Sequence, residues 1–246
     1  MPRRLALVLG LLLSFSAIGR AQTVDDIIAK TIAAQGLDKL KSVQTMRMTA
    51  TMTITPPGMD MAVVIENKRP MKVRETFTIQ GTENIRAYDG QVGWSFIPAQ
   101  GQANPQAATA DDLKELVQEA DIDGALVDYK AKGHKVELVG KEPVQGTDAW
   151  KLKVTLKDGD VQYQYIGAEH YLPIKIDSAR MVGGAEVKAE TFIGDYKDEG
   201  GVMMPHSIET KAQMQGTPFT QKITIQKVEL NVPIDDARFK MPEVKK

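Results

Sequence analysis

Three histidines, His134, His170 and His206, are the residues of this chain best suited to metal binding or proton transfer. Imidazole is a common zinc ligand, and it titrates near neutral pH. The three histidines are evenly spaced, so a fold that brought them together could hold a metal ion. Each of them, however, opens a stretch with strand periodicity, and the segments that follow do not repeat one another. We therefore interpret them as structural residues and predict no metal site.

Nucleophiles for covalent catalysis are scarce in this chain. It contains no cysteine, and beyond residue 21 its serines are Ser42, Ser95, Ser178 and Ser207. None of these serines stands in a G-x-S-x-G elbow, the turn that exposes a hydrolase nucleophile. Acidic pairs occur at expected helix starts or in loops, where carboxylates stabilise free backbone N–H groups. These pairs are Asp25-Asp26, Asp111-Asp112 and Asp235-Asp236. The protein is therefore predicted not to be an enzyme and to need no cofactor.

The methionines form a more informative pattern. Half of the 12 methionines fall within the first three expected strands. They are Met46, Met48, Met52, Met59, Met61 and Met71. Methionine is flexible and polarizable, and it is over-represented on surfaces that accept variable apolar partners. A methionine-rich packed core explains the same pattern, so both interpretations stay open at this point.

Periodicity predicts the elements that position these residues. A capping-box pattern at Thr23 starts a helix that ends at Gly36. From Thr45 the period changes to two, which predicts about five antiparallel strands, with a tight two-residue turn at Asp89-Gly90. A second amphipathic helix is expected over residues 111–120, followed by about six more strands. This order indicates a mainly β fold with α, in which a sheet curls toward a barrel or sandwich and helices cover an open face or end.

The first 21 residues have the layout of a secretory signal peptide. Two arginines precede an apolar run, and Gly19-Arg20-Ala21 is a small-x-small cleavage site. The apolar run is too short for a membrane span, and no cysteine follows it for lipidation. We expect residues 1–21 to be removed and residues 22–246 to form one soluble, unlipidated domain in the periplasm.

The charge balance excludes nucleic acid as a partner. The chain has 31 basic and 32 acidic side chains and a formal net charge of −1. The expected signal peptide contributes arginines and no acid, so the mature chain is more acidic still. A surface that binds nucleic acid needs a basic excess, which this chain lacks.

Five segments, taken in order, resemble the LolA-like group of periplasmic outer-membrane lipoprotein-sorting (carrier) proteins. They are "AAQGLDKLKSVQTMRMTATM", "YDGQVGWSF", "HYLPIKID", "DYKDEGGVMMPHSIE" and "VELNVPIDDARFKMP", and they span nearly the whole mature chain. The resemblance implies a strongly curved, unclosed antiparallel β-barrel of about 11 strands, with helices as a lid over an apolar cavity. It also implies transport of acylated lipoproteins or lipids across the periplasm, without a cofactor.

The resemblance further implies partners and one structural contact. Acyl chains of lipoproteins or lipids would be the ligands, and inner- and outer-membrane transport components would be the donor and the acceptor. The family's carriers use an arginine to tie the lid to the barrel. Arg47 is the nearest candidate here, although its alternation phase groups it with threonines and not with the methionines.

Together with the methionine pattern, the resemblance predicts a ligand-binding surface. Trp94 alternates with Val92 and Phe96, so the three share one face of a strand, and we expect that face to be the concave one. The predicted surface for acyl chains consists of Met48, Met52, Met61, Val63, Phe77, Trp94 and Phe96. Burial of methylenes at ~0.8 kcal/mol each would hold an acyl chain there without any charged contact.

Three functions stay open on this basis. The first is a chaperone-like carrier that sorts acylated lipoproteins or lipids to the outer membrane. The second is a lipid or lipoprotein sensor, or a binding module, that does not transport its ligand. The third, a secreted hydrolase, is disfavoured because the sequence shows neither a nucleophile nor a metal cluster.

The position of signal cleavage can be tested directly. Cleavage after Ala21 predicts that protein recovered from the periplasmic fraction of an expressing bacterium begins at Gln22. N-terminal sequencing measures this. Secreted protein that still begins at Met1, or protein that stays with the membrane after a high-salt wash, contradicts the prediction.

Overall fold

The computed structural model describes residues 22–182, 185–214 and 216–243. The predicted signal peptide, residues 1–21, lies outside the described residues. The helices are α1 (Val24–Gln35), α2 (Leu37–Leu40) and α3 (Ala110–Ala120), with short 3-10 turns η1 (Pro98–Gln100) and η2 (Asp236–Arg238). The strands are β1 (Thr45–Thr55), β2 (Met59–Lys68), β3 (Lys72–Ile79), β4 (Thr82–Tyr88), β5 (Gly93–Phe96), β6 (Gln106–Ala107), β7 (Lys135–Val144), β8 (Thr147–Thr155), β9 (Val161–Gly167), β10 (Pro173–Val182), β11 (Ala185–Asp198), β12 (Met203–Met214) and β13 (Thr217–Leu230).

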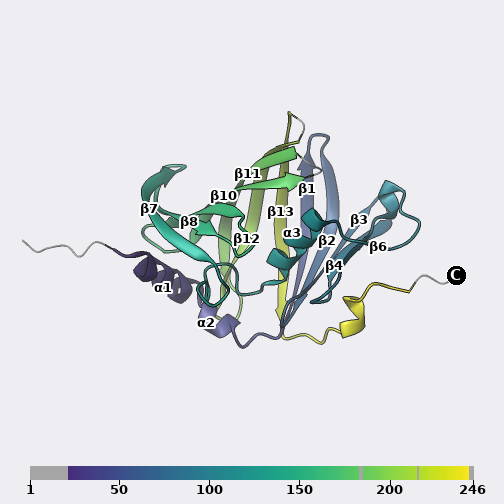
Figure 1. Ribbon diagram of the computed structural model, residues 1–246, viewed down its shortest axis with the longest axis horizontal. Coiled ribbons are helices and arrows are strands. Elements are labelled where there is room, and N and C mark those ends of the chain that lie inside the picture. Colours follow the sequence, from purple (N-terminus) through teal and green to yellow (C-terminus); the bar gives the residue numbers. More distant parts are fainter. Residues whose placement is uncertain (1–21, 183–184, 215, 244–246) are drawn as a thin grey trace, which may run out of the picture.

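All the strands of the described chain belong to one antiparallel sheet, ordered β6-β5-β4-β3-β2-β1-β13-β12-β11-β10-β9-β8-β7. Neighbours in the sheet are also neighbours in sequence except at one place, where the first strand, β1, pairs with the last, β13. The end strands β6 and β7 are not paired with each other in this order, so the sheet stays open. Figure 1 shows it as a curved sheet. The predicted mainly β fold, a strongly curved and unclosed antiparallel sheet with helices, is confirmed.

The sheet has 13 strands, where the sequence predicts about 11. Each half of the chain contributes one strand more than its periodicity indicates. In the first half this is β6, whose two residues are too few for an alternating pattern to show. The second half forms seven strands, β7 to β13, where the sequence predicts about six.

Helix α1 begins and ends at the residues that the sequence predicts, and α3 begins one residue before the expected range of 111–120. Thr23 accepts a hydrogen bond from the backbone of Asp26, whose carboxylate accepts one from the backbone of Thr23. Gly36 ends α1 in the left-handed conformation, and Thr109 caps α3. No helix in the described part of the chain combines the length and the apolar character needed to cross a membrane.

The helices lie on one face of the sheet, which we call the inner face. Ile27 of α1 packs with Leu152 of β8, and Leu116 of α3 packs with Val73 of β3. Figure 1 shows α3 in front of the sheet and α1 near its β7 end. A third apolar cluster, around Ala50, contains residues of the sheet only. The part of the inner face between the helices therefore has an apolar cluster to which no helix contributes a residue.

Gly36 offers a test of how the helices are joined to the sheet. A Cβ at this position would run into the backbone carbonyl of Gly201, in the turn between β11 and β12. Gly36→Ala should therefore add a steric cost of about 1–3 kcal/mol to the cost of about 1–2 kcal/mol for a left-handed alanine. Urea denaturation measures the sum.

Gly58→Ala is the matched control, because Gly58 also has a positive φ but a Cβ there would meet nothing within 4 Å. It should show only the conformational cost. Equal losses of stability in the two variants would contradict close packing between Gly36 and the β11–β12 turn.

Candidate functional site

Three rows of apolar side chains cross the middle of the inner face. Residues directly opposite each other in an antiparallel pair point to the same side of the sheet, so the pairing register assigns each side chain to a face. The first row is Ile193, Ile208, Ile223, Met52 and Met61; the second is Ile225, Ala50, Val63 and Phe77; the third is Val228, Met48 and Ile65. We call these twelve residues the inner wall; none of them is charged.

The inner wall has a packed base and a half-buried surface. Ala50, Val63, Ile225 and Met61 are at most 4% exposed. Around them Met48, Met52 and the other members of the wall are only half-buried. An apolar surface that the described chain covers incompletely is typical of sites that receive an apolar ligand or partner.

Five of the seven predicted site residues belong to this wall. Met48, Met52 and Phe77 lie in its half-buried part, whereas Met61 and Val63 belong to the buried base. The structure thus brings together the methionine-bearing strands that the sequence grouped by phase.

The prediction is wrong for Trp94 and Phe96, which lie on the opposite, outer face. Phe77 pairs with Asn84, so the even-numbered residues of β4 face inward. Trp94 pairs with Ala87 and therefore faces outward. Its side chain is fully buried there, and its indole N–H donates to the carbonyl of Phe239 at 2.7 Å. Alternation shows which residues of one strand share a face. Which face they share with the next strand depends on the pairing register of the two strands, and alternation alone does not give that register.

The prediction of a two-residue turn at Asp89-Gly90 is also wrong. In this half of the sheet, a two-residue turn with both φ values positive lies at Gln80-Gly81, between β3 and β4. At Asp89-Gly90 the loop has four residues, and the Asp89 carboxylate accepts hydrogen bonds from the backbone of Gln91 and Val92. The Gln80-Gly81 turn sets the register between β3 and β4, with Ile79 opposite Thr82. That register, followed along β4 to Ala87, places Trp94 on the outer face.

An ion cluster bounds the third row beside α3. Glu75 follows Ile65 across β2 and β3, and Arg86 is opposite Glu75 on β4. Arg86 pairs with Glu75 at 3.2 Å and with Glu115 of α3 at 2.8 Å. Burial raises the pKa of the Glu75 carboxyl, against the attraction of Arg86. The cluster joins α3 to the sheet and marks where the uncharged wall ends.

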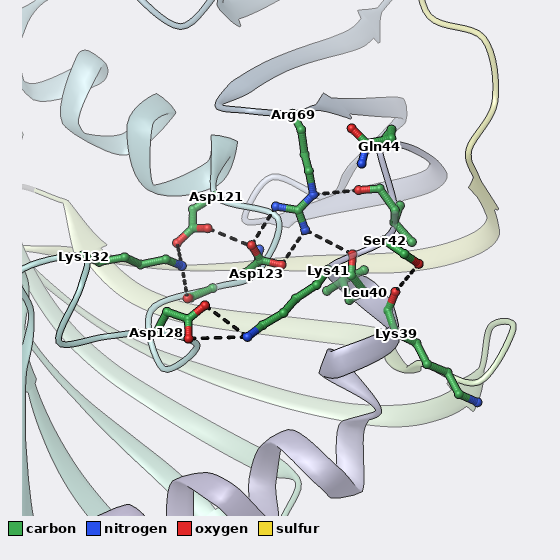
Figure 2. Close-up of polar contacts among 12 residues, drawn as sticks. Lys39, Leu40, Lys41, Ser42, Gln44, Arg69, Asp121, Asp123, Asp128 and Lys132 are labelled. Atoms are coloured by element: carbon green, nitrogen blue, oxygen red, sulfur yellow. Dashed lines mark hydrogen bonds and ion pairs between the residues drawn. The ribbon is translucent and has the colours of Figure 1, made fainter.

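Arg69 joins the other helical segment to the loop after α3. Its guanidinium donates to the carbonyls of Leu40 and Val43 and forms a two-armed pair with Asp123, one arm at 2.7 Å. Figure 2 shows this cluster, together with the nearby Lys41–Asp128 pair. The hydrogen bond from Arg69 lowers the pKa of the Asp123 carboxyl. Paired in this way, Arg69 fixes the end of α2 against the segment that leaves α3.

Arg47, the candidate for such a tie, has a different role. It lies on the outer face and pairs with Glu66 at 2.9 Å. Arg238 pairs with the same carboxylate at 2.7 Å, and Glu66 is only 1% exposed. Arg47 therefore helps to hold the C-terminal segment, and Arg69 is the arginine that contacts the helical segment.

The histidines lie in three separate environments. His134 Nδ1 accepts from the backbone of Lys157, and burial together with Lys132 lowers the pKa of this histidine. His206 is buried between the carbonyl of Ile225 and the carboxylate of Glu199. His170 is exposed. The described residues contain no group of three or more His, Cys, Asp or Glu side chains that could hold a metal ion.

A hollow of about 1000 Å³ lies on the outer face, over β8 to β13. Register assigns its charged lining, including Lys151, Asp177, Glu190 and Lys211, to the face opposite the inner wall. Acyl chains do not favour such a lining, since burying charge without compensation is costly. The inner wall is the better site for an apolar ligand.

A curved, open antiparallel sheet with helices on its inner face defines the LolA-like class of fold, and solved structures share it. A LolA superfamily protein from Nitrosomonas europaea matches with a TM-score of 0.62 at 13% identity, over 89% of this chain and 97% of that one. A DUF1329 family protein from Desulfovibrio piger has a TM-score of 0.60 at 16% identity, with coverage of 87% and 97%. An outer membrane lipoprotein-sorting protein domain from Vibrio parahaemolyticus has a TM-score of 0.59 at 13% identity, with coverage of 87% and 97%. These similarities confirm the LolA-like fold.

A family model described as "Uncharacterized protein" matches residues 60–246, which is most of the chain. The protein belongs to this family. None of the curated proteins matches it.

The packed base and the half-buried surface of the wall predict different mutational costs. Met61→Ala should lower the free energy of unfolding by about 2–5 kcal/mol, the range for emptying a packed site. Met52→Ala, directly opposite it on β1, should cost clearly less, because Met52 is only half-buried. Urea denaturation compares the two. Equal costs would mean that Met52 is ordinary core.

Proposed function

We propose that this protein binds the acyl chains of lipoproteins or lipids on its inner wall and carries them through the periplasm toward the outer membrane. The observation that carries the proposal is the wall itself: three uncharged, apolar cross-strand rows with a packed base and a surface that the described chain leaves half-buried. A wall of this kind is suited to a ligand without charge.

The energy available on such a surface is sufficient for binding. Each buried methylene contributes ~0.8 kcal/mol, so a fully buried chain of about 16 carbons supplies roughly 13 kcal/mol before the cost of association. Met48 and Met52 suit this task, because an unbranched thioether side chain adapts to chains of different shape. The binding would need no catalytic group and no cofactor.

The carrier role and the location rest on two further supports. The fold is shared with a LolA superfamily protein and with a lipoprotein-sorting protein domain. The signal-peptide layout of residues 1–21 favours export and a single mature domain, residues 22–246. In this proposal the helices act as the lid, held by Arg86–Glu115 at α3 and by Arg69 at α2. Membrane components would load and unload the cargo.

Met52→Asp tests binding at the wall. A carboxylate in the middle of the first row would have to lose water when an acyl chain covers it. We expect the affinity for a fluorescent diacyl lipopeptide to fall at least ~tenfold, equivalent to about 1.4 kcal/mol. Thr49→Asp is the matched control, because Thr49 lies on the same strand and faces outward opposite Lys227. It should bind as the wild type does.

Thermal unfolding of both variants establishes that they are folded. A wild-type protein that binds no lipopeptide and carries no lipid in native mass spectrometry would overturn the proposal. Carriage itself is tested by transfer of the bound lipopeptide to acceptor vesicles. Binding without transfer would leave a sensor or binding module.

A further inference from the structure

A row of uncharged polar side chains borders the inner wall on the side of the β10–β11 and β12–β13 hairpins. Gln164 is opposite Ile176, Ile176 opposite Thr191, Thr191 opposite Thr210, and Thr210 opposite Gln221. Gln221 is opposite Ile54 of β1. We call Gln164, Thr191, Thr210 and Gln221 the polar strip. Thr210 and Gln221 are two residues from Ile208 and Ile223, so the strip shares the inner face with the first row of the wall.

The polar strip has hydrogen-bonding capacity that the described chain does not use. Thr191 and Thr210 share one hydrogen bond between their hydroxyl oxygens, 3.0 Å apart. One hydroxyl proton makes that bond, and the other has no acceptor among the described residues. The side-chain amides of Gln164 and Gln221 also make no hydrogen bond within this part of the chain.

Gln164 is the least exposed member of the polar strip. This residue is only 7% exposed. It lies between Leu152, which packs with Ile27 of α1, and the half-buried Ile176. Its amide atoms are not among the fully buried side-chain atoms that lack a partner in the described chain, so the amide opens toward the surface of the inner face. The strip therefore presents donors at the edge of an apolar surface.

The charged chain neighbours of the polar strip point to the outer face. Asp177, Glu190 and Lys211 are the chain neighbours of Ile176, Thr191 and Thr210, and they point outward. The strip itself offers amide and hydroxyl donors without a formal charge. Donors of this kind match a neutral carbonyl oxygen, which needs no counter-charge.

On the basis of the proposed acyl binding, we propose that the polar strip binds the carbonyl oxygens of the linkage between the acyl chains and the rest of the cargo. The ligand class is then a neutral acyl ester or amide. Its chains lie on the inner wall, and its linkage lies at Thr210 and Gln221, toward the hairpin ends. The strip thus sets the direction of the bound cargo and selects for a carbonyl linkage.

Two ligands with the same chains separate this inference from acyl binding in general. Dioleoylglycerol carries ester carbonyls, and the corresponding dialkyl ether has none. Affinities are measured by displacement of a fluorescent alkyl probe from the full mature chain. The wild type should prefer the ester by roughly five- to tenfold, the value of about one hydrogen bond made in a partly buried site.

Gln221→Leu and Thr210→Val remove donors while keeping the side-chain size. Each should reduce the preference for the ester toward unity and leave the affinity for the ether unchanged, which also shows that the wall is intact. Gln213→Leu is the matched control, because Gln213 is an exposed glutamine of β12 that faces outward. It should keep the wild-type preference.

The outcomes are distinguishable. Equal affinity of the wild type for ester and ether overturns the role of the strip and leaves acyl binding standing. A preference for the ester that survives in both Gln221→Leu and Thr210→Val also overturns it. Failure of the wild type to bind either ligand overturns the proposed function, and this inference with it.

Discussion

The pairing of β1 with β13 is the constraint on which the rest of the structure depends. It joins the first strand of the sheet to the last, from Met46 opposite Leu230 to Thr55 opposite Thr220. Closing so long a stretch of chain costs conformational entropy before any contact forms. The pairing places the isoleucines of β12 and β13 beside the methionines of β1 and β2, so that the inner wall becomes continuous. Without it each half of the chain would hold only part of the wall.

The same pairing decides where the C-terminal segment goes. Since β13 lies in the middle of the sheet, the residues after it leave from the centre and cross the outer face of β1 to β5. Phe239 is fully buried there and its carbonyl accepts from Trp94. Glu66, almost completely buried, is paired on both sides by Arg47 and Arg238. A buried carboxylate is tolerable only with such partners. The C-terminal segment thus covers this part of the outer face, while part of the inner face stays half-buried.

The two faces of the sheet thus differ in chemistry as well as in cover. Outside, lysines lie over aromatic rings and beside acids, as Lys175 does with Tyr165 and Glu190. Inside, the rows of the wall are apolar, and the polar strip beside them is uncharged. This segregation is what makes a long neutral ligand the best match for the inner face, and it follows from strict alternation along strands whose register is fixed.

The sequence by itself determined the local features of this protein. The caps of α1, the position of α3, the alternation of β1, the resemblance to LolA-like carriers and the grouping of Met48, Met52 and Phe77 all depend on neighbours in the chain, which periodicity and turn chemistry report. Only the tertiary structure decided which face Trp94 occupies, that Arg69 contacts the helical segment, and that Ile208 and Ile223 complete the wall. These depend on strand register and on the pairing of β1 with β13, which are set by contacts between distant residues and leave no local pattern in the sequence.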